Sequence, residues 1–223
     1  MHFQFLIEDR SSGILIEEIM AKIMNQHPEV TYNCKSFRGI GGFTRKNTVK
    51  ETRTGKLLND LATYLRGFNK SLQGCPAVIV VVADNDTRDT EEFKKQLQGV
   101  ATLNLITLDH VFCIAVEEVE AWLLGDEKAL MKAYPAARLS ELGSYAQDSI
   151  CGTWEKLADV VYPGGYKKLK KDCPTYLEVG AFKCEWAGKI GKHMRFSDNK
   201  SPSFRFFINE IYKRIETADI AVE

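Results

Sequence analysis

Residues 77–83, with the sequence AVIVVVA, constrain the fold more than any other part of this chain. An uninterrupted apolar run rich in β-branched side chains is typical of a strand buried on both faces, as at the centre of a parallel sheet. The run ends at once in Asp84-Asn85-Asp86. We therefore expect a central parallel strand whose carboxyl end carries two aspartates.

Helical and strand patterns alternate around this segment. Alternation of this kind indicates an α/β fold, with a mostly parallel central sheet flanked by helices. We expect a single domain over 1–223, with a core at about 1–126 and a helical or irregular C-terminal extension at about 127–223. The predicted elements are a strand at 2–7, a helix capped by Ser11 or Ser12 and ended by Pro28, a strand at 30–37, helices at 57–67 and 91–97, strands at 103–108 and 111–116, and helices at 117–125 and 203–215.

Composition and local sequence patterns indicate the cellular location of the protein but not its binding partner. Hydrophobic residues make up 44% of the 223 residues, and 30 Lys and Arg balance 30 Asp and Glu, so overall charge indicates no partner. The six cysteines form no C-x-x-C pair and no zinc-ligand spacing with histidine, which favours reduced thiols. We find no signal-peptide pattern and no apolar run of about 20 residues, so we expect a cytoplasmic protein without a membrane partner.

Acidic residues follow the two best strands. Glu8 comes after the first, and Asp84 and Asp86 come after the central one, where ligands bind in parallel α/β sheets. The i, i+2 spacing of the aspartates places both side chains on one side of an extended segment. Carboxylates held together repel unless a cation lies between them, and oxygen ligands favour Mg²⁺ or Mn²⁺. The same Asp-Asn-Asp sequence also suits a turn or a helix cap, the role we expect for Asp89.

A third acidic group follows residues 111–116. Glu117, Glu118 and Glu120 would lie in the first turn of a helix, where acids usually complement the helix dipole. Because this helix is rooted at the same sheet edge, Glu120 is also a candidate for the metal region.

Two basic stretches are candidates for phosphate contacts. Seven basic residues lie between positions 35 and 56, opposed by Glu51 alone, and a second run covers 167–171. Such runs are also typical of solvated surface. The first stretch contains Lys35, Arg38, Arg45, Lys46, Lys50, Arg53 and Lys56.

A strand ending in Glu8, a helix, and a later apolar strand ending in Asp84-Asn85-Asp86 resemble the Toprim domain of topoisomerases, bacterial primases and OLD-family nucleases. Three further segments resemble an uncharacterised Toprim-like family found near phage-defence genes. These segments are GKLL at 55–58, EEVEAWLLGD at 117–126 and SPSFRFF at 201–207. Together the matching pieces span nearly the whole chain.

The resemblance implies roles for individual residues. Glu8 would serve as a metal ligand or general acid/base, and Asp84 and Asp86 would bind Mg²⁺. In the nuclease branch an extra carboxylate helps to hold a second metal, and Glu120 is our candidate, with Asp126 as the alternative. One departure concerns a glycine often found close to the catalytic glutamate, because here Asp9-Arg10-Ser11-Ser12 intervenes before Gly13.

The expected activity is that of a Mg²⁺-dependent Toprim-like nuclease, a hydrolase acting on phosphodiester bonds of DNA or RNA in phage defence. One or two ions would neutralise charge on the phosphate and lower the pKa of a bound water. Lys56 or Lys168 would stabilise the pentavalent state.

Three other functions are compatible with the sequence. The chain could be a non-catalytic or partner-activated nucleic-acid-binding regulatory module that works with an ATPase encoded nearby. It could transfer phosphate on nucleotides, although it has no P-loop sequence. It could also be a structural protein whose acids act only as caps.

Overall fold

The computed structural model describes residues 1–43 and 55–220 and contains one parallel sheet. The strand order is β2-β1-β3-β4, and every neighbouring pair is parallel. The strands are β1 (His2–Ile7), β2 (Thr31–Ser36), β3 (Ala77–Asp84) and β4 (Asp109–Ala115). The expected α/β class is therefore confirmed, and the architecture is consistent with a Toprim-like fold.

The register brings three strand ends to one edge of the sheet. Ile7 pairs with Val82, and Asp84 pairs with Ala115. The backbone N–H of Glu8 continues this pairing by donating to the carbonyl of Val82 at 3.1 Å. Glu8, Asp84 and the chain that leaves β4 must therefore lie close together, as strand ends in a parallel sheet do.

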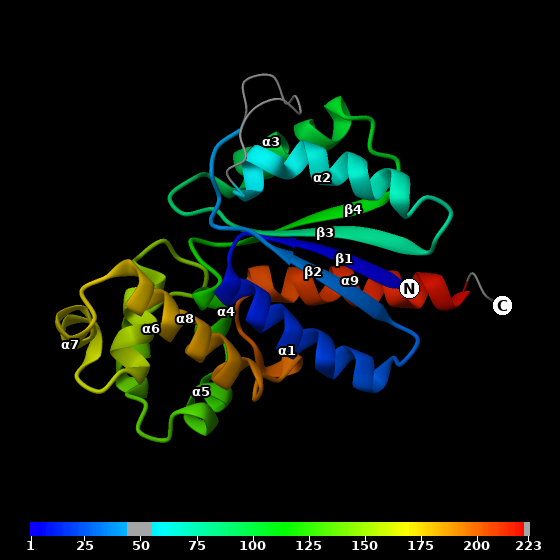
Figure 1. Ribbon diagram of the computed structural model, residues 1–223. Helices are drawn as coiled ribbons and strands as arrows, with labels where there is room; N and C mark the ends of the chain where they lie inside the picture. The colour runs from blue at the N-terminus through cyan, green and yellow to red at the C-terminus, as the bar shows by residue number, and fades with distance from the viewer. Residues whose placement is uncertain (44–54, 221–223) are drawn as a thin grey trace.

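Helices cover both faces of the sheet (Figure 1). One face packs on α2 (Leu57–Ser71) and α3 (Thr90–Leu103), and the other packs on α1 (Arg10–Gln26) and α9 (Pro202–Ile220). Alternate side chains of β3 enter the two hydrophobic clusters, so all eight of its residues are buried. This double burial is the physical reason for the continuous apolar run.

The C-terminal part is helical, as expected, and shares a hydrophobic core with the sheet. Trp122 stacks on Phe207 and donates a hydrogen bond from Nε1 to Ser203 Oγ at 2.9 Å. Residues from both parts therefore fold around one core. The elements are α4 (Glu120–Leu124), α5 (Glu127–Ala133), η1 (Leu139–Ser144), α6 (Thr153–Val161), α7 (Gly165–Asp172), α8 (Tyr176–Gly191) and η2 (Phe196–Asp198).

Helix α8 packs closely along α1. A Cβ atom on Gly191 would lie 2.9 Å from Leu15 Cδ1, and one on Gly188 would lie 3.5 Å from Ile14 Cγ2. Lys22 of α1 reinforces the contact by donating from Nζ to the carbonyls of Gly191 and Met194 at 2.7 and 2.6 Å. The sheet and the extension are thus joined by a close helix contact, which at Gly191 leaves no room for a Cβ atom without a shift of Leu15.

Several predicted elements differ from the structure. No strand covers 103–108, because α3 continues to Leu103 and the chain then turns with a φ of +52° at Leu105. Leu103 and Leu105 are 73% and 81% exposed, so apolar spacing did not indicate burial there. Helices α2, α3 and α9 extend beyond their predicted ends, since helical spacing shows a helix more reliably than its last turn.

Two helix starts also need correction. The cap of α1 is Asp9, whose side chain accepts from the Ser12 N–H at 2.8 Å, rather than Ser11 or Ser12. Helix α4 begins at Glu120 rather than Glu117, because Glu117 adopts a φ of +60° that breaks the helix. Asp89 caps α3 as expected, accepting from the Glu92 N–H at 2.8 Å.

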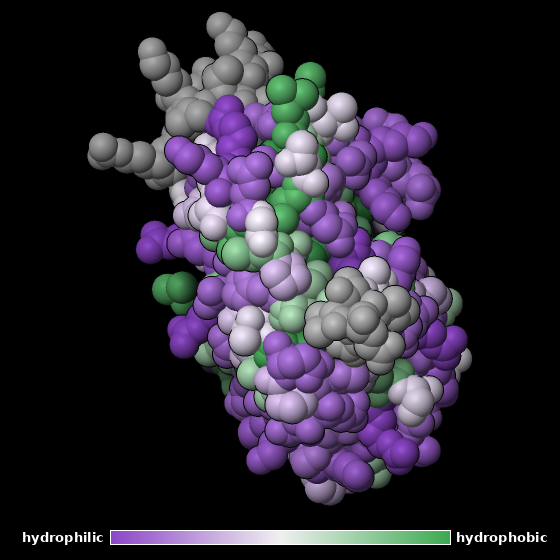
Figure 2. All heavy atoms as spheres, turned by 90° about the vertical axis from the view of Figure 1, so that its right-hand side faces the viewer, coloured by the Kyte–Doolittle hydropathy of each residue, from purple (hydrophilic) through white to green (hydrophobic). Residues whose placement is uncertain are grey.

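The face at the amino ends of the strands is mainly hydrophilic, with a narrow apolar strip (Figure 2). On this side Arg214 of α9 pairs with Asp109 of β4 at 2.6 Å. Within residues 1–43 and 55–220, every helix is too short or too polar to cross a membrane.

We expect Gly191→Ala to lower the free energy of unfolding by about 1–3 kcal/mol, because the new Cβ would overpack the contact with Leu15. Gly180→Ala is the matched control on the same helix, since a Cβ there meets nothing within 4 Å. It should stabilise the helix by up to about 1 kcal/mol. Urea unfolding measures both, and equal effects of the two variants would contradict the packing argument.

Candidate functional site

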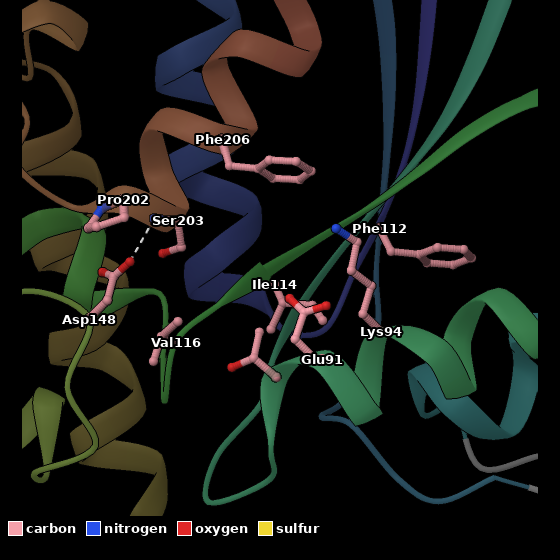
Figure 3. Close-up of a pocket in the computed structure, with 10 residues that line it drawn as sticks. Glu91, Lys94, Phe112, Ile114, Val116, Asp148, Pro202, Ser203 and Phe206 are labelled. Atoms are coloured by element: carbon pink, nitrogen blue, oxygen red, sulfur yellow. Dashed lines mark hydrogen bonds between the residues drawn. The ribbon is translucent and has the colours of Figure 1, made fainter.

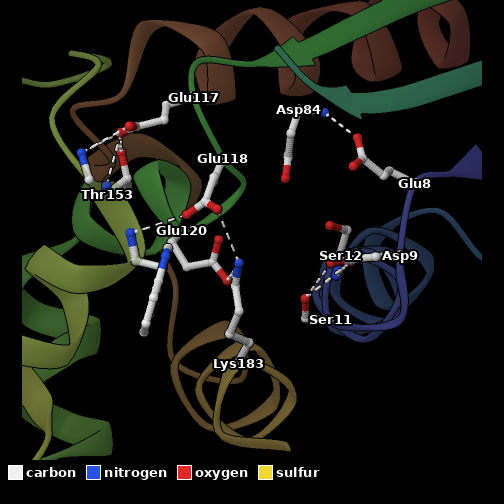
Figure 4. A network of polar contacts seen from close by, with 12 residues as sticks. Glu8, Asp9, Ser11, Ser12, Asp84, Glu117, Glu118, Glu120, Thr153 and Lys183 are labelled. Atoms are coloured by element: carbon white, nitrogen blue, oxygen red, sulfur yellow. Dashed lines mark hydrogen bonds and ion pairs between the residues drawn. The ribbon is translucent and has the colours of Figure 1, made fainter. Parts of the chain in front are cut away.

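Glu8 and Asp84 form the centre of the acidic cluster. Glu8 directly follows β1 and Asp84 ends the adjacent β3, and their exposed fractions are only 8% and 7%. The backbone N–H of Asp84 donates to Glu8 Oε2 at 3.0 Å (Figure 4). Burial raises the pKa of Glu8 to about 7 although this hydrogen bond opposes the shift. Burial, followed by the charges of Glu8 and Glu120, raises the pKa of Asp84 well above its usual range.

Glu118 and Glu120 reach the same region from the turn between β4 and α4. Lys183 of α8 lies between them, with Nζ 3.4 Å from Glu118 Oε1 and 3.3 Å from Glu120 Oε1. Burial raises the pKa of Glu118 to about 8, and burial also raises that of Glu120 against the effect of Lys183. Burial lowers the pKa of Lys183, but the charges of Glu120 and Glu118 outweigh it and hold that pKa above its usual value.

The cluster has more negative than positive charge. Figure 4 shows Asp84, Glu118 and Glu120 directed toward a common space, with Glu8 beside Asp84 and one lysine at its border. Oε2 of Glu120 is buried and has no hydrogen-bond partner among the residues that the structure describes. An oxygen-only donor set with an unsatisfied carboxylate oxygen fits a hard divalent cation.

The side chains as placed do not form a finished coordination shell. Across 1–43 and 55–220, no group of three or more His, Cys, Asp or Glu side chains is arranged to hold a metal ion. Binding at Glu8, Asp84 and Glu120 would therefore require their carboxylates to rotate toward the ion.

Asp86 is arranged differently from our expectation. Strand β3 ends at Asp84, and Asp86 has a φ of +49°, so the extended geometry that would align the two aspartates is lost. Its carboxylate instead pairs with Arg88 Nη1 at 2.7 Å. The charge of Asp86 still contributes to the raised pKa of Glu8.

Asn85, which sequence reasoning left without a role, fixes the ends of two strands. Its fully buried side chain accepts from the backbone N–H of Glu117 and donates to Arg88 O and Thr90 Oγ1, both at 2.8 Å. The bond with Glu117 joins the end of β3 to the segment after β4, and the other two hold the turn that leads into α3. The position of Asn85 between two aspartates was its only signal in the sequence.

Glu117 and Asp126 have structural roles outside the cluster. Glu117 accepts from the N–H groups of Cys151, Gly152 and Thr153, which begin α6. Asp126 caps α5 by accepting from the Ala129 N–H at 2.9 Å and also accepts from the Arg195 N–H. Asp126 is therefore occupied by backbone donors, and Glu120 is the acid that this segment brings to Asp84.

The two lysines selected from the sequence lie outside the cluster. Lys56 is exposed next to α2, and Lys168 pairs with Asp172 on α7 at 2.7 Å. Among the ion pairs of the described residues, neither lysine joins a site carboxylate. Lys183 is the lysine that pairs with carboxylates of the site. In the sequence, its only distinguishing feature was its position on the apolar stripe of α8, with Val179, Trp186 and Ile190.

A groove of about 500 Å³ opens beside the cluster. Glu8, Asp9 and Lys183 line it, and exposed Arg10 and Arg38 add positive charge. At its α8 side Tyr176 is 89% exposed, an unusual position for a large aromatic side chain. Of the predicted basic stretch, Arg45, Lys46, Lys50 and Arg53 lie outside the described residues.

A second pocket, of about 400 Å³, lies between α3, β4 and the start of α9 (Figure 3). Its walls include Phe112, Ile114 and Phe206. Its aspartate, Asp148, accepts from the Ser203 N–H and from Ser201 Oγ, both at 2.6 Å. Because that carboxylate is already used to hold the start of α9, this pocket is the weaker candidate for chemistry.

Comparisons with protein-family models, curated proteins and solved structures found no match to this chain. The Toprim resemblance of its motifs therefore stays a prediction.

The raised pKa of Glu8 predicts how stability depends on pH. Between about pH 4.5 and 7 the folded protein retains a proton that the unfolded chain releases, so the free energy of unfolding falls as pH rises. The shift corresponds to about 3 kcal/mol. In metal-free buffer Glu8→Gln should flatten this part of the profile, as measured by urea unfolding across that range.

Glu185→Gln is the control for this measurement, because Glu185 forms an exposed pair with Lys189 on α8. It should leave the slope of the wild-type profile unchanged. Parallel profiles for Glu8→Gln and the wild type would show that Glu8 titrates normally.

Proposed function

We propose that this protein is a Mg²⁺-dependent, Toprim-like nuclease that hydrolyses phosphodiester bonds in nucleic acid. The main support is the meeting of buried Glu8 and Asp84 with Glu120 beside a groove that carries Arg10 and Arg38. Charged carboxylates in such a place need a cation, and arginines in such a groove suit phosphate. A cytoplasmic location and a part in phage defence belong to the same proposal.

Glu8, Asp84 and Oε2 of Glu120 would hold Mg²⁺ or Mn²⁺. Once bound, the ion would supply charge neutralisation at the phosphate and a lowered pKa for a ligated water. Asp86 could contribute a further oxygen if its carboxylate left Arg88. The bound cation would offset the electrostatic repulsion between these carboxylates.

Side chains of the protein itself would transfer the proton, bind the phosphates and stack on a base. The N–H of Asp84 fixes Oε2 of Glu8, which leaves Oε1 either to bind the ion or to accept a proton from a nucleophilic water. Arg10 and Arg38 would bind backbone phosphates, and Tyr176 would stack on a base.

One observation favours the alternative of a partner-activated module. The acids face the same space but are not closed into a coordination shell within the described residues. Nucleic acid or a partner such as an ATPase could bring them together. In that case cleavage would be seen only after the partner is added.

The direct test compares cleavage of single-stranded DNA, double-stranded DNA and RNA with Mg²⁺ or Mn²⁺. Asp84→Asn and Glu8→Gln should each reduce the rate by about 100-fold or more, because each removes a ligand or the base. Asp172→Asn changes an exposed acid paired with Lys168 and should cleave like the wild type.

Undiminished cleavage by Asp84→Asn would refute the assignment of the site. Cleavage that begins only when an ATPase from a neighbouring gene is added would favour the regulatory module.

Tyr176→Ala should weaken the binding of a single-stranded oligonucleotide by about 10-fold, because base stacking on an aromatic side chain contributes about 1–3 kcal/mol. Fluorescence anisotropy in EDTA measures binding without cleavage. Leu103→Ala is the control, since Leu103 is also exposed but ends α3 away from the groove. Equal affinities of Tyr176→Ala and the wild type would exclude the stacking role.

A further inference from the structure

The ammonium group of Lys183 lies where two acidic side chains of one turn converge. Its Nζ is 3.3 Å from Glu120 Oε1 and 3.4 Å from Glu118 Oε1. The three side chains are 16%, 1% and 20% exposed in the order Lys183, Glu120, Glu118. The lysine comes from α8 of the C-terminal part, whereas both acids precede or begin α4.

We propose that Lys183 takes, as an internal cation, the place of a second divalent ion between Glu118 and Glu120, so that the site binds a single divalent ion. The position of that single ion, at Glu8 and Asp84, rests on the proposed function.

The contacts of the four carboxylate oxygens of Glu118 and Glu120 support this assignment. Glu118 Oε1 faces Lys183, and Glu118 Oε2 accepts from the Trp154 N–H at 3.2 Å. Glu120 Oε1 also faces Lys183, which leaves Glu120 Oε2 as the unpartnered buried oxygen of the pair within the described residues. One free oxygen can complete the shell of an ion at Asp84, whereas an ion between Glu118 and Glu120 would need the two oxygens that now face Lys183.

Electrostatic repulsion gives a second reason. The ammonium of Lys183 already lies between Glu118 and Glu120, so a divalent ion at the same place would lie directly beside a positive charge. The second ion would therefore have to displace Lys183, whose side chain is held on the apolar stripe of α8.

Counting bound Mn²⁺ by calorimetry and electron paramagnetic resonance tests the proposal without reference to activity. The wild type should bind one ion per chain. Lys183→Met keeps the length of the apolar stem, removes the charge and should raise the count to two. The double variant Lys183→Met/Glu118→Gln should return it to one, because the second ion loses a ligand.

Lys189→Met is the matched control, since Lys189 lies on the exposed side of α8 and pairs with Glu185. It should bind one ion, as the wild type does. Glu118→Gln alone should also keep one ion, because Glu118 is not a ligand in the wild type. Loss of the ion from this variant would overturn the role of Lys183 even if Lys183→Met fails to fold, which circular dichroism would show.

Other outcomes separate the two proposals. Two ions on the wild type, one ion on folded Lys183→Met, or loss of the ion in Glu118→Gln would overturn the role of Lys183. No ion on the wild type but one on Lys183→Met would support that role and contradict the proposed metal-dependent activity. No ion on either protein would contradict both.

Discussion

Repulsion between buried carboxylates is the constraint on which the functional edge of this protein depends. Glu8 follows β1 and Asp84 ends β3, two strands that are buried on both faces, so the backbones of the two acids cannot separate without disturbing the sheet. The N–H of Asp84 offsets part of that cost for Glu8, and Lys183 offsets part of it for Glu118 and Glu120. What remains is an excess of negative charge that a cation or protons must balance.

The sheet could be predicted because its signals are local. Strand β3 is recognisable from its apolar run alone, and its aspartate marks the edge. The predicted strand at 103–108 was wrong because Leu103 ends α3, Leu105 lies in the turn after it, and no partner strand in the described residues covers either side chain. Hydrophobic spacing reports burial only where tertiary structure provides another layer, and a single sequence does not show where that layer ends.

The site was predictable only in part. Glu8, Asp84 and Glu120 meet because each follows or adjoins the end of a neighbouring strand, which the order of elements indicated. Lys183 could not be placed in this way, because it is 63 residues beyond Glu120 and reaches it through the packing of α8 on α1. Asp86 itself adopts a left-handed backbone conformation, and the residue types alone do not distinguish such a turn from the end of an extended strand.

Helix α8 carries both an aromatic side chain of the groove and the ammonium of the acidic cluster. At 1.5 Å per residue, Tyr176 lies about 22 Å from Gly191, with Lys183 roughly midway. Because both side chains belong to one rigid helix, any displacement of α8 that widened the groove would also change the distance between Lys183 and its two acids.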